Sequence, residues 1–244
     1  MSNMLLAIDA GNTRIKWGIH DGAKWSRTGA IPVAEEIAGG LGGFTLPQHI
    51  VISNVAGKDV KVRLTAALDA PGRRMHFIES VAGQCGVRNG YRNATQLGTD
   101  RWAALIAAHA MSPLARLIVM AGTATTIDAL TAQGEFLGGV ILPGVELMHR
   151  ALHDNAAQLG VPPGHIEDFP KDTANAIASG ALQASVGAIM RMREVLRARI
   201  GDEPGCCLSG GASGLLAGHL PFAAEIRDNL VLDGLVIIAR EVST

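Results

Sequence analysis

Hydrophobic and polar side chains alternate near the start of the chain. In residues 13–20, TRIKWGIH, isoleucine and tryptophan alternate with Arg14, Lys16 and Gly18, which is the period-two pattern of a strand with one buried face. The apolar segment MLLAIDA precedes it, and Gly11-Asn12 stands between the two segments. The pattern predicts two antiparallel strands joined by a tight turn.

The rest of the chain shows the periodicities of both strands and helices. Further strands are expected at 25–31 and 49–55, and as strand–turn–strand–turn–strand over 117–130 and 134–144. Helices are expected over 60–68, 101–111, 145–158 and 174–200. Residues 206–218 favour a strand that ends in Ser-Gly-Gly and leads into a helix, whereas residues 83–98 favour a polar loop.

The second half of the chain repeats the opening pattern. Aligning Gly11 with Gly122 pairs LLAIDAGNT (5–13) with RLIVMAGTA (116–124), an offset of 111 residues. Such a period is far too long for a solenoid and indicates two copies of one domain. We therefore predict an α/β protein of two closely packed lobes, 1–112 and 113–244, each opening with an antiparallel hairpin.

Composition narrows the class of protein. Hydrophobic residues make up 48% of the chain and charged residues 18%, which excludes a disordered chain. Lys plus Arg number 21 and Asp plus Glu 22, a net charge of −1 that gives no bulk field for nucleic acid or an anionic membrane. An odd number of cysteines and the lack of a signal peptide or long apolar segment favour a soluble protein of the reducing cytoplasm.

Two glycine turns are candidate phosphate sites. Residues 9–13, Asp-Ala-Gly-Asn-Thr, place a carboxylate at a strand end before backbone N–H groups that suit a phosphate and Mg²⁺. Residues 122–126, Gly-Thr-Ala-Thr-Thr, form the same turn in the second copy. The alternatives are an ordinary hairpin turn at the first position and simple strand propensity at the second.

Two further motifs precede predicted helices. Asp100 and Arg101 together supply a general base and an anion clamp, although an aspartate at a loop-to-helix junction is also a common N-cap. Ser209-Gly210-Gly211 lets a nucleotide approach the backbone closely, and it is equally typical of a tight strand-to-helix turn.

These motifs, in this order, resemble those of the type III pantothenate kinases. That family, also described as Bvg accessory factor-like, belongs to the superfamily of acetate kinases, sugar kinases, Hsp70 and actin. Residues 9–13, with Lys16 and Gly18 after them, are similar to its first phosphate motif, and Tyr91 with 97–102 is similar to its pantothenate motif. Residues 122–126 are similar to its second phosphate motif, and residues 138–139 and 143–144 are similar to the strand and turn that follow that motif. Asp172-Thr173 and residues 209–211 extend the agreement almost to the C-terminus.

The resemblance implies a fold and a reaction. The fold is two ribonuclease H-like, actin-like lobes, each a mixed sheet flanked by helices. The reaction is ATP-dependent phosphorylation of pantothenate to 4'-phosphopantothenate, the first step of coenzyme A biosynthesis, with Asp100 as the catalytic base. The ATP-binding residues implied, with Mg²⁺ near Asp9, are Asp9, Ala10, Gly11, Asn12, Thr13, Arg14, Ile15, Lys16 and Thr123. The pantothenate-binding residues implied are Tyr91, Gly98, Thr99, Asp100, Arg101 and, from the partner subunit of a homodimer, Thr173.

The chain departs from the family pattern at two positions. Ala94 stands where the family usually has proline, which changes the stiffness of the loop. Met120 stands where the family usually has an aspartate associated with a bound K⁺ or NH₄⁺ ion. Because a thioether is a poor ligand for such cations, we expect only weak dependence on a monovalent cation.

Two other functions fit parts of the sequence. A kinase of the same fold could act on another small hydroxyl acceptor, although Tyr91 and the Asp100-Arg101 pair argue against it. A non-catalytic accessory factor for transcription is the second alternative, and the near-neutral charge with Asp9 and Asp100 both present argues against DNA contact.

Overall fold

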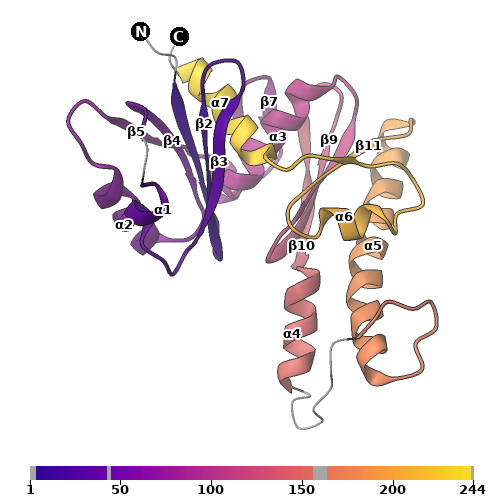
Figure 1. Ribbon diagram of the computed structural model, residues 1–244. Helices are drawn as coiled ribbons and strands as arrows, with labels where there is room; N and C mark the ends of the chain where they lie inside the picture. The colour runs from indigo at the N-terminus through magenta and orange to yellow at the C-terminus, as the bar shows by residue number, and fades with distance from the viewer. Residues whose placement is uncertain (1–3, 43–44, 156–163, 243–244) are drawn as a thin grey trace. The chain divides into compact units, whose positions relative to one another are not determined.

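The computed structural model describes residues 4–42, 45–155 and 164–242. The chain forms two compact units (Figure 1), one of Met1–Ser112 with Asn229–Thr244 and one of Pro113–Asp228. The last helix, α7 (Leu230–Val242), lies in the first unit, whereas the expected lobes were 1–112 and 113–244.

The first unit is built on a five-stranded mixed sheet. Its strands are β1 (Leu5–Ala10), β2 (Arg14–His20), β3 (Trp25–Pro32), β4 (His49–Asn54) and β5 (Arg74–Phe77), in the order β3-β2-β1-β4-β5. The β1–β2 and β2–β3 pairs are antiparallel, and the β1–β4 and β4–β5 pairs are parallel. The predicted opening hairpin is confirmed, with its turn at residues 11–13.

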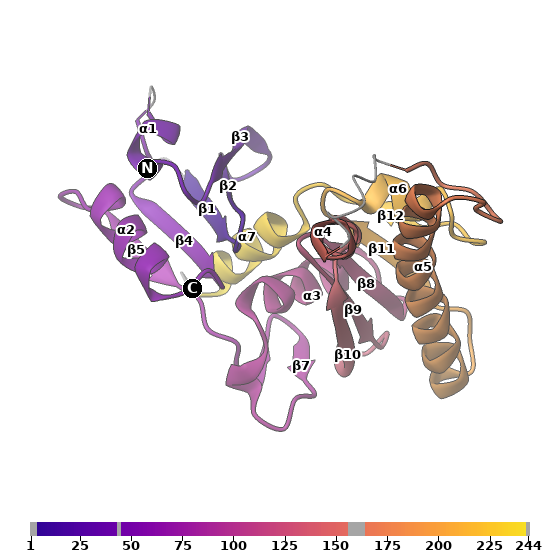
Figure 2. The same cartoon turned by 90° about the horizontal axis from the view of Figure 1, so that it is seen from below.

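The two faces of this sheet carry different helices (Figures 1 and 2). Ile8, Ile15 and Ile52 point to one face, where they form a core with side chains of α1 (Ile37–Gly40) and α2 (Lys58–Leu68). The opposite face carries α3 (Thr99–Met111) and α7, and eight consecutive residues of α3, 101–108, are buried. Alternation along the strands therefore leaves Asp9, Lys16 and Ser53 on the face of α3 and α7.

Close packing of α7 on α3 explains why the end of the chain returns to the first unit. Seven residues of α7 are buried, and Gly234 lies directly against the backbone carbonyl of Ala103. A side chain at position 234 would overlap that carbonyl, so glycine permits the contact between the helices. The sequence analysis assigned no helix to residues 230–242 and so missed this closure.

The second unit repeats the topology of the first. Its strands are β8 (Arg116–Ala121), β9 (Ala124–Leu130), β10 (Glu135–Pro143), β11 (Gly205–Ser209) and β12 (Glu225–Ile226), in the order β12-β11-β8-β9-β10. The β8–β9 and β9–β10 pairs are antiparallel, and the β8–β11 and β11–β12 pairs are parallel. If β8, β9, β10, β11 and β12 are matched with β1, β2, β3, β4 and β5, the two sheets have the same strand order. The predicted duplication is therefore confirmed.

The described residues of the second unit form three helices. The long helix α5 (Thr173–Ile200) packs Leu182, Val186 and Ile189 against the apolar side chains of β8, β9 and β11. The other two are α4 (Val145–Asn155) and α6 (Ser213–Ala217). The predicted extension of α4 to residue 158 lies outside the described residues. No helix in the described ranges is long and apolar enough to cross a membrane.

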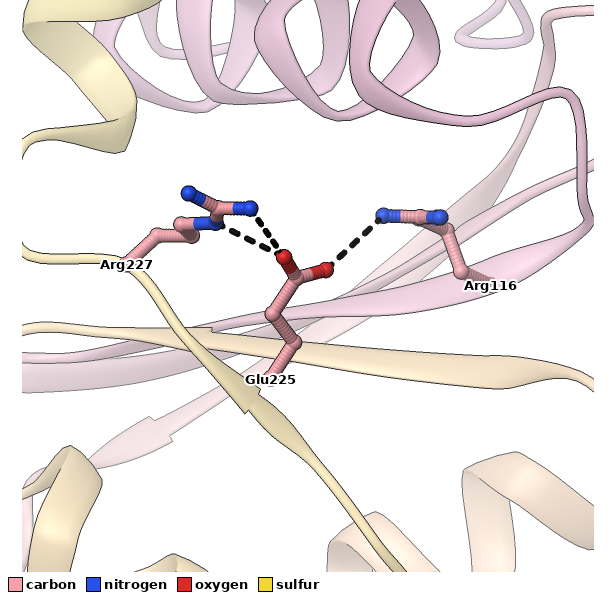
Figure 3. A network of polar contacts seen from close by, with 3 residues as sticks. All are labelled: Arg116, Glu225 and Arg227. Atoms are coloured by element: carbon pink, nitrogen blue, oxygen red, sulfur yellow. Dashed lines mark hydrogen bonds and ion pairs between the residues drawn. The ribbon is translucent and has the colours of Figure 1, made fainter.

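An ionic network ties the short edge strand β12 to the sheet (Figure 3). The carboxylate of Glu225 lies between Arg116, 3.7 Å away at Nη1, and Arg227, which it contacts closely. Arg116 is the buried first residue of β8, at the end opposite the Gly122 turn. The network therefore supports the sheet edge and lies away from the glycine turn of this unit.

The predicted polar loop 83–98 contains short regular elements. Strands β6 (Gly83–Gln84) and β7 (Val87–Asn89) form a small hairpin, and the 3₁₀-helix η1 (Ala94–Gln96) follows. The indole Nε1 of the fully buried Trp102 donates to Oε1 of Gln84 at 3.2 Å. This bond anchors the hairpin to α3.

Candidate active site

Three polar side chains form a row across the first sheet. Asp9 on β1 is in register with Lys16 on β2 and with Ser53 on β4, so all three lie on the face of α3 and α7. Asp9 and Ser53 stand near the carboxyl ends of parallel strands, the edge at which open α/β sheets place their ligands. The row is the base of the candidate site.

Asp9 is electrostatically unusual. Its Oδ1 atom is buried and makes no hydrogen bond within the described part of the chain. Burial, helped by the charge of Asp100 and opposed by Lys16, raises the pKa of Asp9 to about 7. A buried carboxylate oxygen without a partner is the kind of group that a bound cation stabilises, so Asp9 fits the Mg²⁺ ion expected with ATP.

The first glycine turn exposes backbone beside Asp9. Gly11 N–H donates to the carbonyl of Arg14 at 3.1 Å, which closes the turn, and Asn12 and Thr13 are exposed. Ala10 and Ile15, both among the predicted ATP-binding residues, have their side chains in the hydrophobic core. Those two residues can therefore offer a ligand only their backbone atoms.

The first turn of α3 positions Asp100. The N-cap is Gly98, so the alternative expectation that Asp100 is the N-cap is wrong. Oδ1 of Asp100 accepts the N–H of Arg101 at 2.8 Å, and a Cβ at position 98 would lie 2.6 Å from that oxygen. Burial raises the pKa of Asp100, while the N–H and the charge of Arg101 oppose the shift. The result is a confined carboxylate with a raised proton affinity, which is the direction that favours a general base.

Arg101 and Tyr91 are brought together, as the sequence motif implied. Nη1 of Arg101 donates to the hydroxyl of Tyr91 at 2.9 Å, and the guanidinium carbon lies 5.6 Å from the centre of the tyrosine ring. Arg101 is only 4% exposed. A guanidinium held in this way is suited to bind a carboxylate.

Ser53 is a site residue that the sequence analysis missed. Its hydroxyl is fully buried and shares a 2.9 Å hydrogen bond with the hydroxyl of Thr99, the first residue of α3. Ser53 therefore links the row on the sheet to the helix that carries Asp100. The only signal in the sequence is one serine in an apolar strand, and this signal does not identify a partner 46 residues away.

The second unit contains the other predicted phosphate turn. Gly122 N–H donates to the carbonyl of Ala124 at 3.1 Å, and Thr123 is exposed. This turn is one residue shorter than that of Gly11, because Ala121 pairs with Thr125 whereas Ala10 pairs with Ile15. Gly144 packs directly on the carbonyls of residues 122 and 123, and Gly210, with φ 106°, packs on that of Ala121. Side chains at these two glycines would fill the space, so both are required for the close approach of backbone around the turn.

Met120 occupies the position in β8 that Asp9 occupies in β1. Its registered neighbours are Thr126 on β9 and Ser209 on β11. The second row therefore consists of two hydroxyl groups around a thioether, and it lacks the carboxylate of the first row.

Thr173 begins α5, one residue before the predicted start of this helix at 174. The side chain of Asp172 caps this helix by accepting the N–H of Asn175 at 2.9 Å. Thr173 is exposed and lines a cavity of about 580 Å³ in the second unit, together with Leu152, Lys171 and Ala176. The described contacts join Thr173 to no other predicted pantothenate-binding residue.

Comparison with known proteins identifies close relatives over the whole chain. The model of a family described as type III pantothenate kinase matches residues 5–195. The type III pantothenate kinase of Nitrosospira multiformis is 45% identical over 245 residues, covering 100% of this chain and 94% of that protein. The enzyme of the same name from Aromatoleum aromaticum is 48% identical, with 98% of each chain covered.

Solved structures show the same fold at low sequence identity. A protein of Campylobacter jejuni assigned to the Baf family of transcriptional activators is 20% identical, with a TM-score of 0.64 and 98% of each chain covered. MreB5 of Spiroplasma citri is 8% identical, with a TM-score of 0.54 and 99% and 98% coverage. These likenesses confirm the predicted actin-like fold of duplicated ribonuclease H-like lobes.

Proposed function

The chain belongs to the type III pantothenate kinase family, and we propose that it transfers the γ-phosphoryl group of ATP to the primary hydroxyl of pantothenate, the first step of coenzyme A biosynthesis. The observation that carries this assignment is the cluster of Asp9, Asp100, Arg101 and Tyr91 within one unit. It combines a buried carboxylate with one unpartnered oxygen, a second confined carboxylate and a guanidinium held by a tyrosine, the groups that such a transfer requires.

Asp100 is the base in this proposal, and Arg101 with Tyr91 binds the carboxylate of the acceptor. The raised pKa of Asp100 lets it take the proton of the attacking hydroxyl. Gly98 keeps the space beside Oδ1 of Asp100 free of a side chain, and Thr99 is held by Ser53. Phosphoryl transfer depends mainly on positioning and charge neutralisation, and these residues supply the positioning.

Asp9 and the glycine turns bind the nucleotide in this proposal. Asp9 would hold Mg²⁺, which neutralises phosphate charge when bound, and Lys16 adds a positive charge in the adjacent register position. The exposed backbone of residues 11–14 and Thr123 would contact the phosphate oxygens. Ala10 and Ile15 serve this role through their backbone only.

We also propose a homodimer in which Thr173 of one chain completes the pantothenate site of its partner. One support is the exposed position of Thr173 at the start of α5. The other is the cavity beside Thr173, which is lined in part by Leu152, a side chain that is 52% exposed. A second copy would cover this partly apolar surface.

For the monovalent cation, we propose that this chain depends on K⁺ or NH₄⁺ only weakly. The row around Met120 offers the hydroxyls of Thr126 and Ser209 and no carboxylate. Position 120 therefore adds no negative charge for a counter-ion to balance. The buried carboxylate of Asp128, two residues along β9, already accepts the hydroxyl of Thr126 at 3.5 Å.

The decisive experiment measures ATP turnover by the purified protein with pantothenate and with a panel of other small hydroxyl acceptors. We expect pantothenate to be preferred, and Asp100→Asn to lower single-turnover rates by about 10²–10⁴-fold while binding of both substrates persists. Preference for another acceptor would support the alternative kinase. No turnover with any acceptor, together with DNA binding by the folded protein, would support the transcription accessory factor instead.

A further inference from the structure

Tyr91 lies in a segment without regular secondary structure. Residues 90–93 connect β7 to η1 and contain no helix or strand. At the far end, Oδ1 of Asn93 accepts the N–H and the hydroxyl of Thr95, which organises η1 and not the residues before it. A side-chain hydrogen bond can hold the backbone at Tyr91 in place of a helix or strand ladder.

Asn89 is placed to do so. It is the last residue of β7, and its N–H donates to the carbonyl of Ala82 at 2.9 Å. The hairpin below it is held on α3 by Trp102 and Gln84, and on α7 by the Glu241 carboxylate, which accepts the N–H of Cys85 at 3.0 Å. Asn89 therefore belongs to a hairpin that hydrogen bonds attach to both α3 and α7.

The side-chain amide of Asn89 bonds to Tyr91, within the segment, and to Ala94, which follows it. Its Oδ1 accepts the N–H of Tyr91 at 3.0 Å, and its Nδ2 donates to the carbonyl of Ala94 at 3.2 Å. A rotated amide would place donor against donor and acceptor against acceptor, so the two partners define one orientation. These bonds clamp residues 91–94 into a closed turn, and the hydroxyl of Tyr91 then meets Arg101.

We propose that Asn89 is a positioning residue that sets the affinity of the site for the carboxylate of the acceptor, by holding Tyr91 against Arg101. The proposal rests on the proposed function for the identity of that acceptor. The clamp itself is a property of the chain without substrate. Asn89 acts through Tyr91 and Arg101 and contacts no reacting atom in this scheme.

The backbone geometry at residues 93 and 94 allows a second substitution that compensates for the loss of the two Asn89 hydrogen bonds. Asn93 is extended, with φ −121° and ψ 107°, and Ala94 is the first residue of η1. A proline is well accommodated at a first helical position after an extended residue. Ala94→Pro therefore restricts the same segment without using Asn89.

The kinetic experiment compares four variants. We expect Asn89→Ala to raise KM for pantothenate about tenfold, the equivalent of about 1.4 kcal/mol for two lost hydrogen bonds, with kcat and KM for ATP within about threefold of wild type. Asn89→Ala/Ala94→Pro should recover part of the affinity, and Ala94→Pro alone should leave it unchanged. Asn93→Ala, in the same loop, is the matched control and should change KM less than about twofold, since its exposed bonds lie within η1.

A second measurement does not depend on the substrate. Hydrogen exchange of the peptide covering residues 89–97, in the protein without ligand, should become faster in Asn89→Ala and slower again in the double variant. If the wild type phosphorylates pantothenate while Asn89→Ala changes neither exchange nor KM, the proposal is overturned. Equal losses of kcat and of affinity for ATP would also overturn it, because they would indicate general disruption. If exchange responds as expected and pantothenate is not a substrate, the clamp stands and the proposed function fails.

Discussion

Asp9→Asn should make the protein more stable and less active. In the metal-free protein the Asp9 carboxylate is buried and has an unpartnered oxygen, and its pKa is raised from 3.8 to about 7. The shift is therefore about 3 pKa units, and at 1.36 kcal/mol per unit the ionised group costs the folded state up to about 4 kcal/mol. An asparagine of the same shape carries no charge and avoids that cost.

The pH dependence follows from the direction of the shift. Between pH 4 and 7 the folded protein binds the proton of Asp9 more tightly than the unfolded chain does, so stability falls as the pH rises through this window. The advantage of Asp9→Asn should be near zero at pH 4 and reach its full value above pH 7. Asp21→Asn is the matched control, because backbone N–H groups of Lys24 and Ala23 lower the pKa of Asp21 and the sign is reversed.

Urea unfolding followed by tryptophan fluorescence, in the presence of a chelator, provides the assay. All three tryptophans, Trp17, Trp25 and Trp102, lie in the first unit, so the signal reports the unit that contains Asp9. A difference below about 0.5 kcal/mol at pH 8, or one that does not shrink toward pH 4, would refute the burial argument. In activity assays Asp9→Asn should need higher concentrations of Mg²⁺ and ATP, while pantothenate binding stays nearly unchanged. If the Mg²⁺ titration of the variant matched that of wild type, Asp9 would not be the metal-binding group.

Three other predictions use different parts of the molecule. Gly234→Ala should lower the free energy of unfolding by about 1–3 kcal/mol in the same fluorescence assay, because the new Cβ overlaps the carbonyl of Ala103. Helix propensity alone predicts a gain of about 1 kcal/mol, so the sign decides between the two effects. K⁺ should activate the wild type less than about tenfold, which corresponds to about 1.4 kcal/mol in the activation barrier. Met120→Asp should increase the activation by K⁺, and both are measured as initial rates at constant ionic strength. Stronger activation of the wild type would mean that other groups form the cation site. Mixing Asp100→Asn chains with chains that carry a bulky residue at Thr173 should restore part of the activity in heterodimers, whereas failure despite demonstrated subunit exchange would place each site within one chain.

Local patterns were enough to predict much of the architecture. Alternating side chains located β2, and the apolar segment before it located β1. The repeated glycine turns at Gly11 and Gly122 predicted the duplication that the two matching strand orders confirm. The Ala-rich pattern predicted a helix from residue 101, two residues after α3 begins, and the family resemblance assigned Tyr91 and Arg101 to one pantothenate site. These features depend on neighbours in sequence or on a pattern that recurs, and both are visible in a single chain.

Other properties depended on contacts between residues far apart in sequence. Gly234 shows no signal of its own, yet its fit against Ala103 accompanies the return of α7 to the first unit. The pairing of Ser53 with Thr99 depends on the register of β4 and on where α3 begins. The raised pKa of Asp9 follows from burial and from Asp100, 91 positions away. Periodicity determines which face of an element is apolar, but close packing of complete elements determines which polar groups then meet and how far water is excluded from them.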